Sequence, residues 1–215
     1  AEGAIELPPE ADGLRIPSLT VRSGALAATL EGRVDGLATD APALDLRLVV
    51  LDGDPRPLLA SLGVALPFAD PEALARLGGE ATITGTPEAL ELAPLTLRMD
   101  ALRVQGRAGL RTAGGRPRVA FDLDAGEADL RPYLVTAAEE TAPEDGPLLA
   151  DEPLGLEVLE TFDARGRLRA DAVITPQLAV GATIVDATLE AGRLDARLRA
   201  DRVYGGSVDV AVDLD

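Results

Sequence analysis

Histidine, cysteine, tryptophan, lysine and asparagine are all absent from the 215 residues of the chain. Without histidine, cysteine and lysine there is no Ser–His, Cys–His or Ser–Lys nucleophile. There is also no thiolate or imidazole zinc site, and no phosphate loop built on lysine. General acid–base chemistry is left to carboxylates, arginines and two tyrosines. The composition therefore points away from an enzyme, and toward a structural, binding or transport module.

Positive charge and aromatic rings are also scarce. The 20 cationic residues, all arginine, face 37 acidic ones, and the formal net charge is −17. A nucleic-acid partner is disfavoured, because neutralising phosphates requires a basic surface. Aromatic residues make up only 2% of the chain, so the core and any binding surface must be aliphatic. The missing cysteines exclude a disulfide framework and fit either the cytosol or a bacterial envelope compartment.

Long hydrophobic runs are missing as well. No window holds 18 consecutive apolar residues, so the sequence predicts no membrane-spanning helix. The most apolar stretch, 58–69, is interrupted by Gly63 and Pro67. The chain starts at Ala1 without a signal peptide or an initiator methionine. We interpret it as a fragment of a longer protein, and expect any membrane anchor to lie outside it.

The dominant positive feature is alternation of apolar and polar residues with a period of two. In the segment 44–50, for example, leucine and valine alternate with aspartate and arginine. One apolar and one charged face per strand is typical of half-buried antiparallel β structure. The segments with this pattern are 44–50, 95–105, 119–124, 164–174, 194–199 and 208–214. Glycines separate them at short spacing, so we predict a mainly β fold, an antiparallel meander of about a dozen strands with a few short helices.

Helical signals occur at three places. Asp54 and Pro55 open a short helix expected near 55–63. Asp70 as N-cap with Pro71 at the first position predicts a second helix near 70–78. A third short helix is expected over 153–159. We divide the chain into a β-rich unit over 1–135, an acidic, proline-containing linker or loop over 136–153, and a β meander over 154–215 that either continues the same sheet or forms a second unit.

A weak internal repeat accompanies these helical signals. The sequence Asp-Pro-Arg-Pro-Leu-Leu at 54–59 is echoed by Asp-Leu-Arg-Pro-Tyr-Leu at 129–134. Each copy follows an alternating strand, which ends near 51 and 123 respectively. The echo therefore predicts a strand-rich unit, capped by a small helical element, that occurs twice.

Paired acids and clustered arginines are the candidate chemical features. Asp-x-Asp pairs occur at 52/54, 122/124 and 213/215, and such pairs bind divalent cations in some proteins. Here they lie on the polar side of strands, so we expect a solvated face, no metal site and no cofactor. A pair of acids for glycoside hydrolysis is disfavoured by the scattered aromatics. The arginines at 165, 167, 169, 193, 197 and 199 are expected to pair across strands with Asp163, Asp171, Asp195 and Asp201, although anionic headgroups are the alternative ligands.

The apolar strand faces allow two interpretations that periodicity does not separate. One is the closed core of a sandwich, and the other is a curved sheet whose inner face stays partly open as an aliphatic groove. In the second case, shared parity within the strands predicts the residues that line the groove. They are Leu95, Leu97, Met99, Phe121, Leu123, Leu168, Ile174, Leu198, Val208 and Val210.

The order of several loose motifs resembles the AsmA family of bacterial envelope proteins. These motifs are Asp-Glu-Pro-Leu at 151–154, Leu-Glu-Thr-Phe-Asp at 159–163, Gly-Arg-Leu-Arg-Ala at 166–170 and Tyr-Gly-Gly-Ser at 204–207. The segments 178–186 and 189–194, the two Asp-x-Arg-Pro echoes and the segment 58–78 are also similar to that family. The resemblance covers most of residues 40–215.

This resemblance implies an inner-membrane-anchored protein of a Gram-negative bacterium with a periplasmic body, related to TamB and to bridge-like lipid-transfer proteins. Its sheet would curl, taco-like, into an aliphatic groove. Its function would be non-enzymatic support of phospholipid transport between the inner and outer membranes and of outer-membrane assembly, with phospholipid or another acyl-chain lipid as ligand and envelope proteins as further partners. The alternative is a structural or adaptor β module that docks on an envelope protein complex without binding lipid.

Overall fold

The computed structural model describes residues 2–6, 12–61, 68, 70–112, 114–134, 161–203 and 205–214. Over these residues the fold is mainly β, with a large, mostly antiparallel sheet and one short helix, α1 (Arg56–Ser61). The predicted linker over 136–153 and the predicted helix over 153–159 lie outside the described residues.

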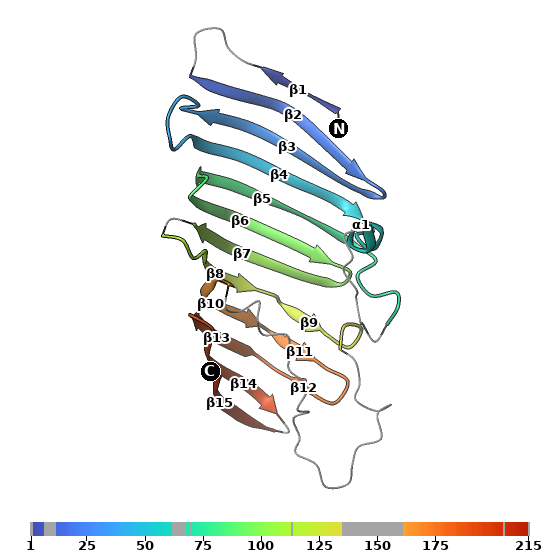
Figure 1. The fold of residues 1–215 in the computed structure, drawn as a ribbon. Helices are drawn as coiled ribbons and strands as arrows, with labels where there is room; N and C mark the ends of the chain where they lie inside the picture. The colour runs from blue at the N-terminus through green and yellow to red at the C-terminus, as the bar shows by residue number, and fades with distance from the viewer. Residues whose placement is uncertain are drawn as a thin grey trace.

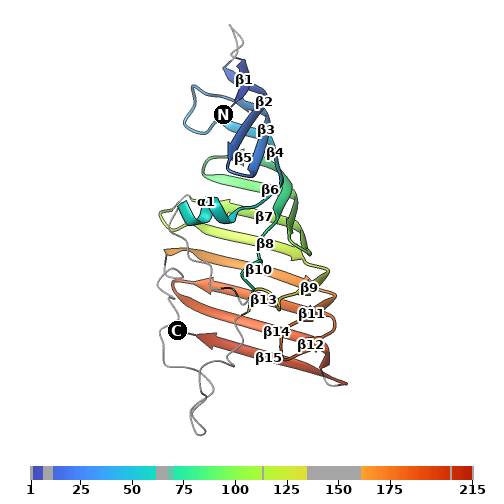
Figure 2. The same cartoon turned by 90° about the vertical axis from the view of Figure 1, so that its right-hand side faces the viewer.

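The large sheet has twelve strands in the order β1-β2-β3-β4-β5-β6-β7-β8-β10-β13-β14-β15 (Figure 1). Their bounds are β1 (Glu2–Glu6), β2 (Gly13–Ser23), β3 (Leu26–Asp35), β4 (Ala43–Gly53), β5 (Leu77–Thr86), β6 (Ala89–Met99), β7 (Leu102–Arg111), β8 (Arg118–Asp124), β10 (Asp163–Ala170), β13 (Thr183–Glu190), β14 (Arg193–Val203) and β15 (Gly206–Leu214). In Figure 2 the first strands are seen nearly edge-on and the last ones broadside, because the sheet twists along its length.

Sequential strands pair with each other, as the predicted meander requires, except at one junction. There β8 pairs with β10 in parallel, with Val119 opposite Ala164 and Leu123 opposite Leu168. Parallel neighbours need a long connection that returns the chain to the same end of the sheet, and residues 130–162 provide it. The strands after this connection therefore continue the same sheet, which is the first of the two arrangements left open for 154–215.

A three-stranded sheet extends three of the main strands. It consists of β9 (Glu127–Asp129), β11 (Ala172–Ile174) and β12 (Ala179–Val180), in the order β12-β11-β9. The backbone of β8 continues into β9 and that of β10 into β11, through an irregular step at which both Asp171 and Ala172 donate their amides to the Gly126 carbonyl. Alternation of side chains is interrupted at this step.

The helix predicted near 55–63 is present as α1, but the prediction of a helix near 70–78 is wrong. Asp70 does cap the segment, since its Oδ1 accepts the Glu72 amide at 2.8 Å. The cap opens only a turn, because Leu74 takes a positive φ of 58° that ends any helical path. The backbone then enters β5 at Leu77, where sheet pairing with β4 and β6 replaces the hydrogen bonds of a helix.

The two Asp-x-Arg-Pro copies form the same local structure. Asp54 accepts the backbone amide and Nε of Arg56 at 2.9 Å each, and its second oxygen accepts Nη2 at 2.7 Å. Asp129 accepts the corresponding groups of Arg131 at 3.1, 2.9 and 2.6 Å. In both copies the last leucine donates its amide to the residue after the aspartate, at 3.0 and 3.1 Å. The sequence echo is therefore also a structural repeat, in which a strand is followed by an aspartate–arginine contact and a helical turn. We call the contacts of Asp54 with Arg56 and of Asp129 with Arg131 the Asp–Arg hooks.

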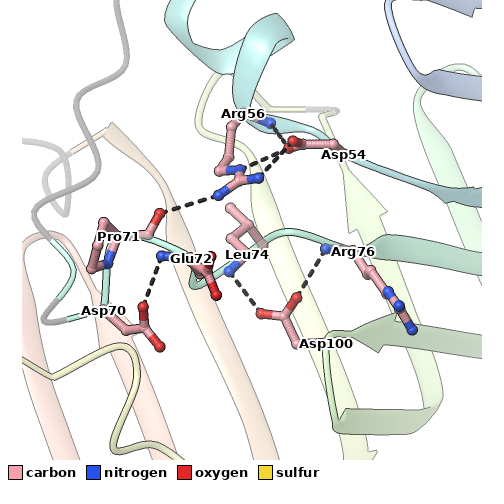
Figure 3. A network of polar contacts seen from close by, with 8 residues as sticks. All are labelled: Asp54, Arg56, Asp70, Pro71, Glu72, Leu74, Arg76 and Asp100. Carbon is pink, nitrogen blue, oxygen red and sulfur yellow. Dashed lines mark hydrogen bonds and ion pairs between the residues drawn. The ribbon is translucent and has the colours of Figure 1, made fainter.

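Asp100, in the turn between β6 and β7, binds the segment that follows α1 (Figure 3). Its carboxylate accepts the Leu74 amide at 2.7 Å and the Arg76 amide at 2.9 Å. It also accepts the hydroxyl of Tyr133 at 2.6 Å, which belongs to the second copy. The segment after α1 is thus fixed to the second hook at one edge of the sheet.

Candidate functional site: the aliphatic face of the sheet

The strand registers place most apolar residues of the long strands on one side of the sheet, while Val49, Leu51 and Ile184 lie on the other. In neighbouring strands Leu48 lies opposite Ala81, and Ala81 lies opposite Leu95. Residues directly opposite each other share a face. Where a register shifts, as between Leu92 and Leu95 in β6, the shift restores the apolar residues to the same side. We call this side the aliphatic face and the other side the charged face.

Nine of the ten residues predicted to line a groove lie on the aliphatic face. Leu97 pairs with Val104, Phe121 with Ala108, Leu168 with Val185, and Leu198 with Val210, so that the rows are continuous from β6 to β15. Each of the ten is only partly covered or exposed, and Leu97, Leu198 and Val210 keep 39%, 36% and 42% of their surface exposed. The nine are Leu95, Leu97, Met99, Phe121, Leu123, Leu168, Leu198, Val208 and Val210.

Ile174 is the residue that the structure separates from the other nine. It lies in β11, where its neighbour Val173 packs against the buried alanines 125, 128 and 170. Because adjacent residues of a strand point to opposite sides, Ile174 faces away from that cluster. The irregular step at Asp171 inverts the parity that the sequence pattern carries from Leu168 onward.

Buried residues of the aliphatic face include Ile16, Ala81, Ala170, Leu189 and Ala200, while most of its other described positions stay at least partly exposed. The one cluster of buried residues joins Ala125, Ala128 and Ala170, with Leu102, Val104, Leu130, Leu168 and Val173 packed around it. It lies where β9 and β11 extend the sheet. Among the described residues no side chain has less than 2% of its surface exposed. A closed sandwich core would contain many such side chains, so the described part of the chain does not form one.

Gly166 shows how closely neighbouring strands approach on this face. A Cβ at this position would lie 2.4 Å from both Cγ and the carbonyl oxygen of Phe121. The Phe121 ring therefore covers the space above the glycine, and any side chain there would displace it. Phe121 is the only aromatic residue among the nine lining residues, and its ring can pack over this strand because Gly166 has no side chain.

The charged face carries cross-strand ion pairs, as predicted, but mostly with other partners than those expected. Arg167 binds Asp186, Arg169 binds Asp122 at 2.8 Å, and Arg197 binds Asp209 at 2.6 Å. Arg193 lies 2.6 Å from Asp213 and 3.9 Å from Asp195, the one predicted acid among its partners. Asp163 pairs with Arg116 and Arg118 instead, and Arg165 has no ion pair within the described ranges.

In two of these pairs the arginine favours the ionised form of the acid. The hydrogen bond from Arg167 lowers the pKa of Asp186, and that from Arg197 lowers the pKa of Asp209. The Asp-x-Asp pairs also have partners other than metal: Asp52 binds Arg98 at 3.1 Å, and Asp124 accepts the Gly126 amide at 3.0 Å. Within the described residues no group of three or more acids is arranged to hold a metal ion, and Asp215 lies outside them.

Several exposed residues of the aliphatic face were not among those predicted. Val212 and Leu214 lie opposite Ala196 and Leu194 and are 41% and 42% exposed. Together with Leu198 and Val210 they form a contiguous aliphatic patch over β14 and β15. The same alternation that identified Val208 and Val210 extends to both, and would have identified them.

No protein-family model, no curated protein and no solved structure matches this chain. In the part of the chain that the structure describes, no helix is both long and apolar enough to cross a bilayer.

Proposed function

We propose that the chain is a non-enzymatic β module of the AsmA type, whose aliphatic face carries the acyl chains of phospholipid. In this proposal the sheet curls so that the face becomes the inner surface of a groove. The protein would act in the periplasm of a Gram-negative bacterium, held to the inner membrane by an anchor outside the present sequence. It would support phospholipid movement toward the outer membrane and outer-membrane assembly.

The physical reason for such a surface is the cost of exposing hydrocarbon to water. At ~0.8 kcal/mol per methylene, a 16-carbon chain costs about 13 kcal/mol to transfer into water. A continuous apolar track removes much of this barrier without any chemistry. It requires only aliphatic side chains on one face of successive strands, and neither histidine, cysteine, lysine nor a metal.

The observation that carries the proposal is the exposure of one chemically uniform face. Monomeric soluble proteins rarely leave contiguous apolar surface uncovered, and larger patches mark interaction sites. Of the nine large hydrophobic residues that are exposed in the described part of the chain, six belong to the aliphatic face. They are Val21, Leu97, Leu198, Val210, Val212 and Leu214.

Lipid extraction combined with native mass spectrometry tests the proposal. The chain is exported to the periplasm of a Gram-negative host, purified without detergent and analysed for bound phospholipid. Wild-type protein is expected to retain phospholipid. Leu97→Asp and Leu198→Asp are expected to lose most of it while the circular dichroism spectrum stays unchanged, since both side chains are already more than one third exposed.

Leu51→Asp is the matched control. Leu51 is 53% exposed but lies on the charged face. It pairs with Ala27, whereas its neighbour Val50, on the aliphatic face, pairs with Ala28. The same leucine-to-aspartate change there should leave the bound lipid unaltered. Absence of phospholipid from the wild-type protein, or equal loss in all three variants, contradicts the proposal and favours the adaptor module that docks on an envelope complex without lipid.

A further inference from the structure

We propose that the charged face holds a second binding site, which takes a phosphate-bearing anion. The site is a hollow of about 900 Å³ over β6, β7, β8 and the start of β10. It lies on the opposite side of the sheet from the aliphatic face and is independent of the proposed lipid function.

The hollow exists because two adjacent positions of the charged face carry almost no side chain. Gly109 of β7 lies directly opposite Ala120 of β8, and together they form its floor. A Cβ at Gly109 would fit without a clash, because its nearest neighbour would be the Leu90 carbonyl oxygen at an ordinary contact distance of 3.5 Å. Longer side chains at the surrounding positions then form walls around this low centre.

Arginines dominate those walls. Arg111 and Arg118 lie directly opposite each other, a like-charge cross-strand pair that destabilises a sheet unless something neutralises it. Arg165, opposite Ala120, lines the third side. Arg118 reaches the Asp163 carboxylate only at 3.6 Å, and Asp163 is shared with Arg116 at 3.4 Å. Within the described ranges neither Arg111 nor Arg165 has an ion pair.

Two other hollows of the charged face have equal numbers of arginines and carboxylates, although one of them also contains a directly opposed pair, Arg15 and Arg33. Four arginines and four carboxylates line the one over β10, β13, β14 and β15, and three of each line the one over β2, β3 and β4. Five arginines and four carboxylates line the proposed site, in a chain whose net charge is −17. Local excess positive charge decides the interaction, because charges farther away than about 8 Å are largely screened at physiological salt.

Phosphate matches this arrangement better than a single carboxylate does. A guanidinium presents a planar fork of donors that binds phosphate oxygens in a bidentate fashion. The dianion can neutralise two forks at once, which is what the opposed Arg111 and Arg118 require. Both an inorganic phosphate and the headgroup of an anionic phospholipid present this chemistry.

The test titrates inorganic phosphate into the isotope-labelled chain and follows the backbone amides of residues 107–111 and 118–122 by NMR. Saturable shifts at these amides are expected, weakening as salt is raised. The double variant Arg111→Gln/Arg165→Gln should bind about tenfold more weakly or worse, since each charge-assisted hydrogen bond is worth about one decade in affinity. Ala120→Leu, which fills the floor without changing charge, should abolish the shifts.

Arg167→Gln/Arg197→Gln removes the same charge from the neighbouring, balanced hollow and is the matched control. Phosphate affinity should stay within about twofold in this variant, because both of its arginines are already paired with acids. The proposal is overturned if the control variant binds phosphate as weakly as the Arg111→Gln/Arg165→Gln variant. It is also overturned if the wild-type chain shows no saturable shifts with phosphate and does not bind vesicles containing phosphatidic acid.

Vesicles of phosphatidylcholine with and without phosphatidic acid distinguish the two sources of the phosphate group. Binding that requires both phosphatidic acid and the pair Arg111 and Arg165 supports a lipid headgroup as the natural ligand. Saturable binding of inorganic phosphate without vesicle binding supports a free phosphate compound. Neither outcome alters the lipid extraction experiment on the aliphatic face, so the two proposals fail separately.

Discussion

Tyr133 donates its hydroxyl to the Asp100 carboxylate, with 2.6 Å between Oη and Oδ2. The same carboxylate accepts the amides of Leu74 and Arg76. The Tyr133 ring also packs edge-on against Phe68, with centroids 5.5 Å apart. The segment that follows α1 and the second copy of the repeat are thus held together by one carboxylate and one phenol.

Tyr133→Phe isolates the hydroxyl, because the ring contact with Phe68 remains. We expect this variant to unfold with a free energy lower by about 1 kcal/mol, the usual worth of a partly exposed hydrogen bond. Urea denaturation with an unchanged slope measures the loss. An unchanged midpoint would show that the hydroxyl contributes nothing to the connection between the segment after α1 and the second copy.

The stabilising contribution of Asp100 depends on pH. Partial burial raises the pKa of its carboxyl, but the hydrogen bonds from Tyr133 and from the amides of Arg76 and Leu74 outweigh burial and lower the pKa below its ordinary value. A lowered pKa in the folded state gives stability that is present above the unfolded pKa of about 4 and is lost as the pH falls through the folded value. The free-energy difference between wild type and Asp100→Asn should therefore be constant from about pH 7 to 5 and shrink below about pH 4.

Chemical denaturation of both proteins across this range measures the difference. A gap between wild type and Asp100→Asn that stays the same down to acid pH, or widens, contradicts the role assigned to the carboxylate. Tyr133→Phe provides a second reference, because it retains a titrating Asp100 without one of the hydrogen bonds that lower its pKa.

Gly166→Ala should destabilise the sheet by about 1–3 kcal/mol, the range for overpacking a well-filled site. The new methyl would collide with both the ring and the carbonyl oxygen of Phe121. Adding Phe121→Ala should recover only part of the loss, since the carbonyl stays in place. Gly109→Ala is the control, because a methyl group there would meet only the Leu90 carbonyl oxygen at an ordinary contact distance, and its thermal midpoint should not fall. Equal midpoints for Gly166→Ala and Gly109→Ala would argue against the close approach.

The two Asp–Arg hooks should respond alike to the same change. Arg56→Lys and Arg131→Lys each keep the charge but lose the fork that reaches both oxygens of Asp54 and Asp129. We expect several-fold faster amide hydrogen exchange at Leu59 and Leu134 respectively, because their amides close the turns that the hooks begin. A change at one turn only would mean that the two copies are not equivalent.

Alternation was enough to predict a mainly antiparallel sheet, because apolar and charged residues on opposite sides of a strand favour one register over all others. It was also enough to place Leu97, Phe121, Leu198 and Val210 on a common face, since neighbouring strands keep their parity across tight turns. The repeat at 54–59 and 129–134 predicted a shared capping element for a physical reason. An aspartate two residues before an arginine can bind that residue's amide and guanidinium together.

Tertiary contacts decided what the pattern missed. The helix predicted near 70–78 does not form, because Leu77 and Gly79 pair with β6 as part of β5. The carboxylate of Asp100, which lies far away in sequence, also binds the Leu74 amide. Ile174 does not lie on the predicted face, because an irregular backbone step at Asp171 inverts the alternation of side chains between the two faces. Such a step has no signature in the residue types. Parallel pairing of β8 with β10 depends on a connection whose direction alternation does not encode.

Face-specific photocrosslinking tests the central claim most directly. A photoreactive amino acid is placed at Leu97, Leu168 or Val210 on the aliphatic face, and at Leu51, Arg167 or Ala211 on the charged face. The protein is irradiated in the envelope of a Gram-negative host, and covalently attached phospholipid is measured by mass spectrometry. Phospholipid attached at the first three positions and not at the second three is the predicted result. Attachment at neither set, or equally at both, would contradict a lipid-carrying aliphatic face.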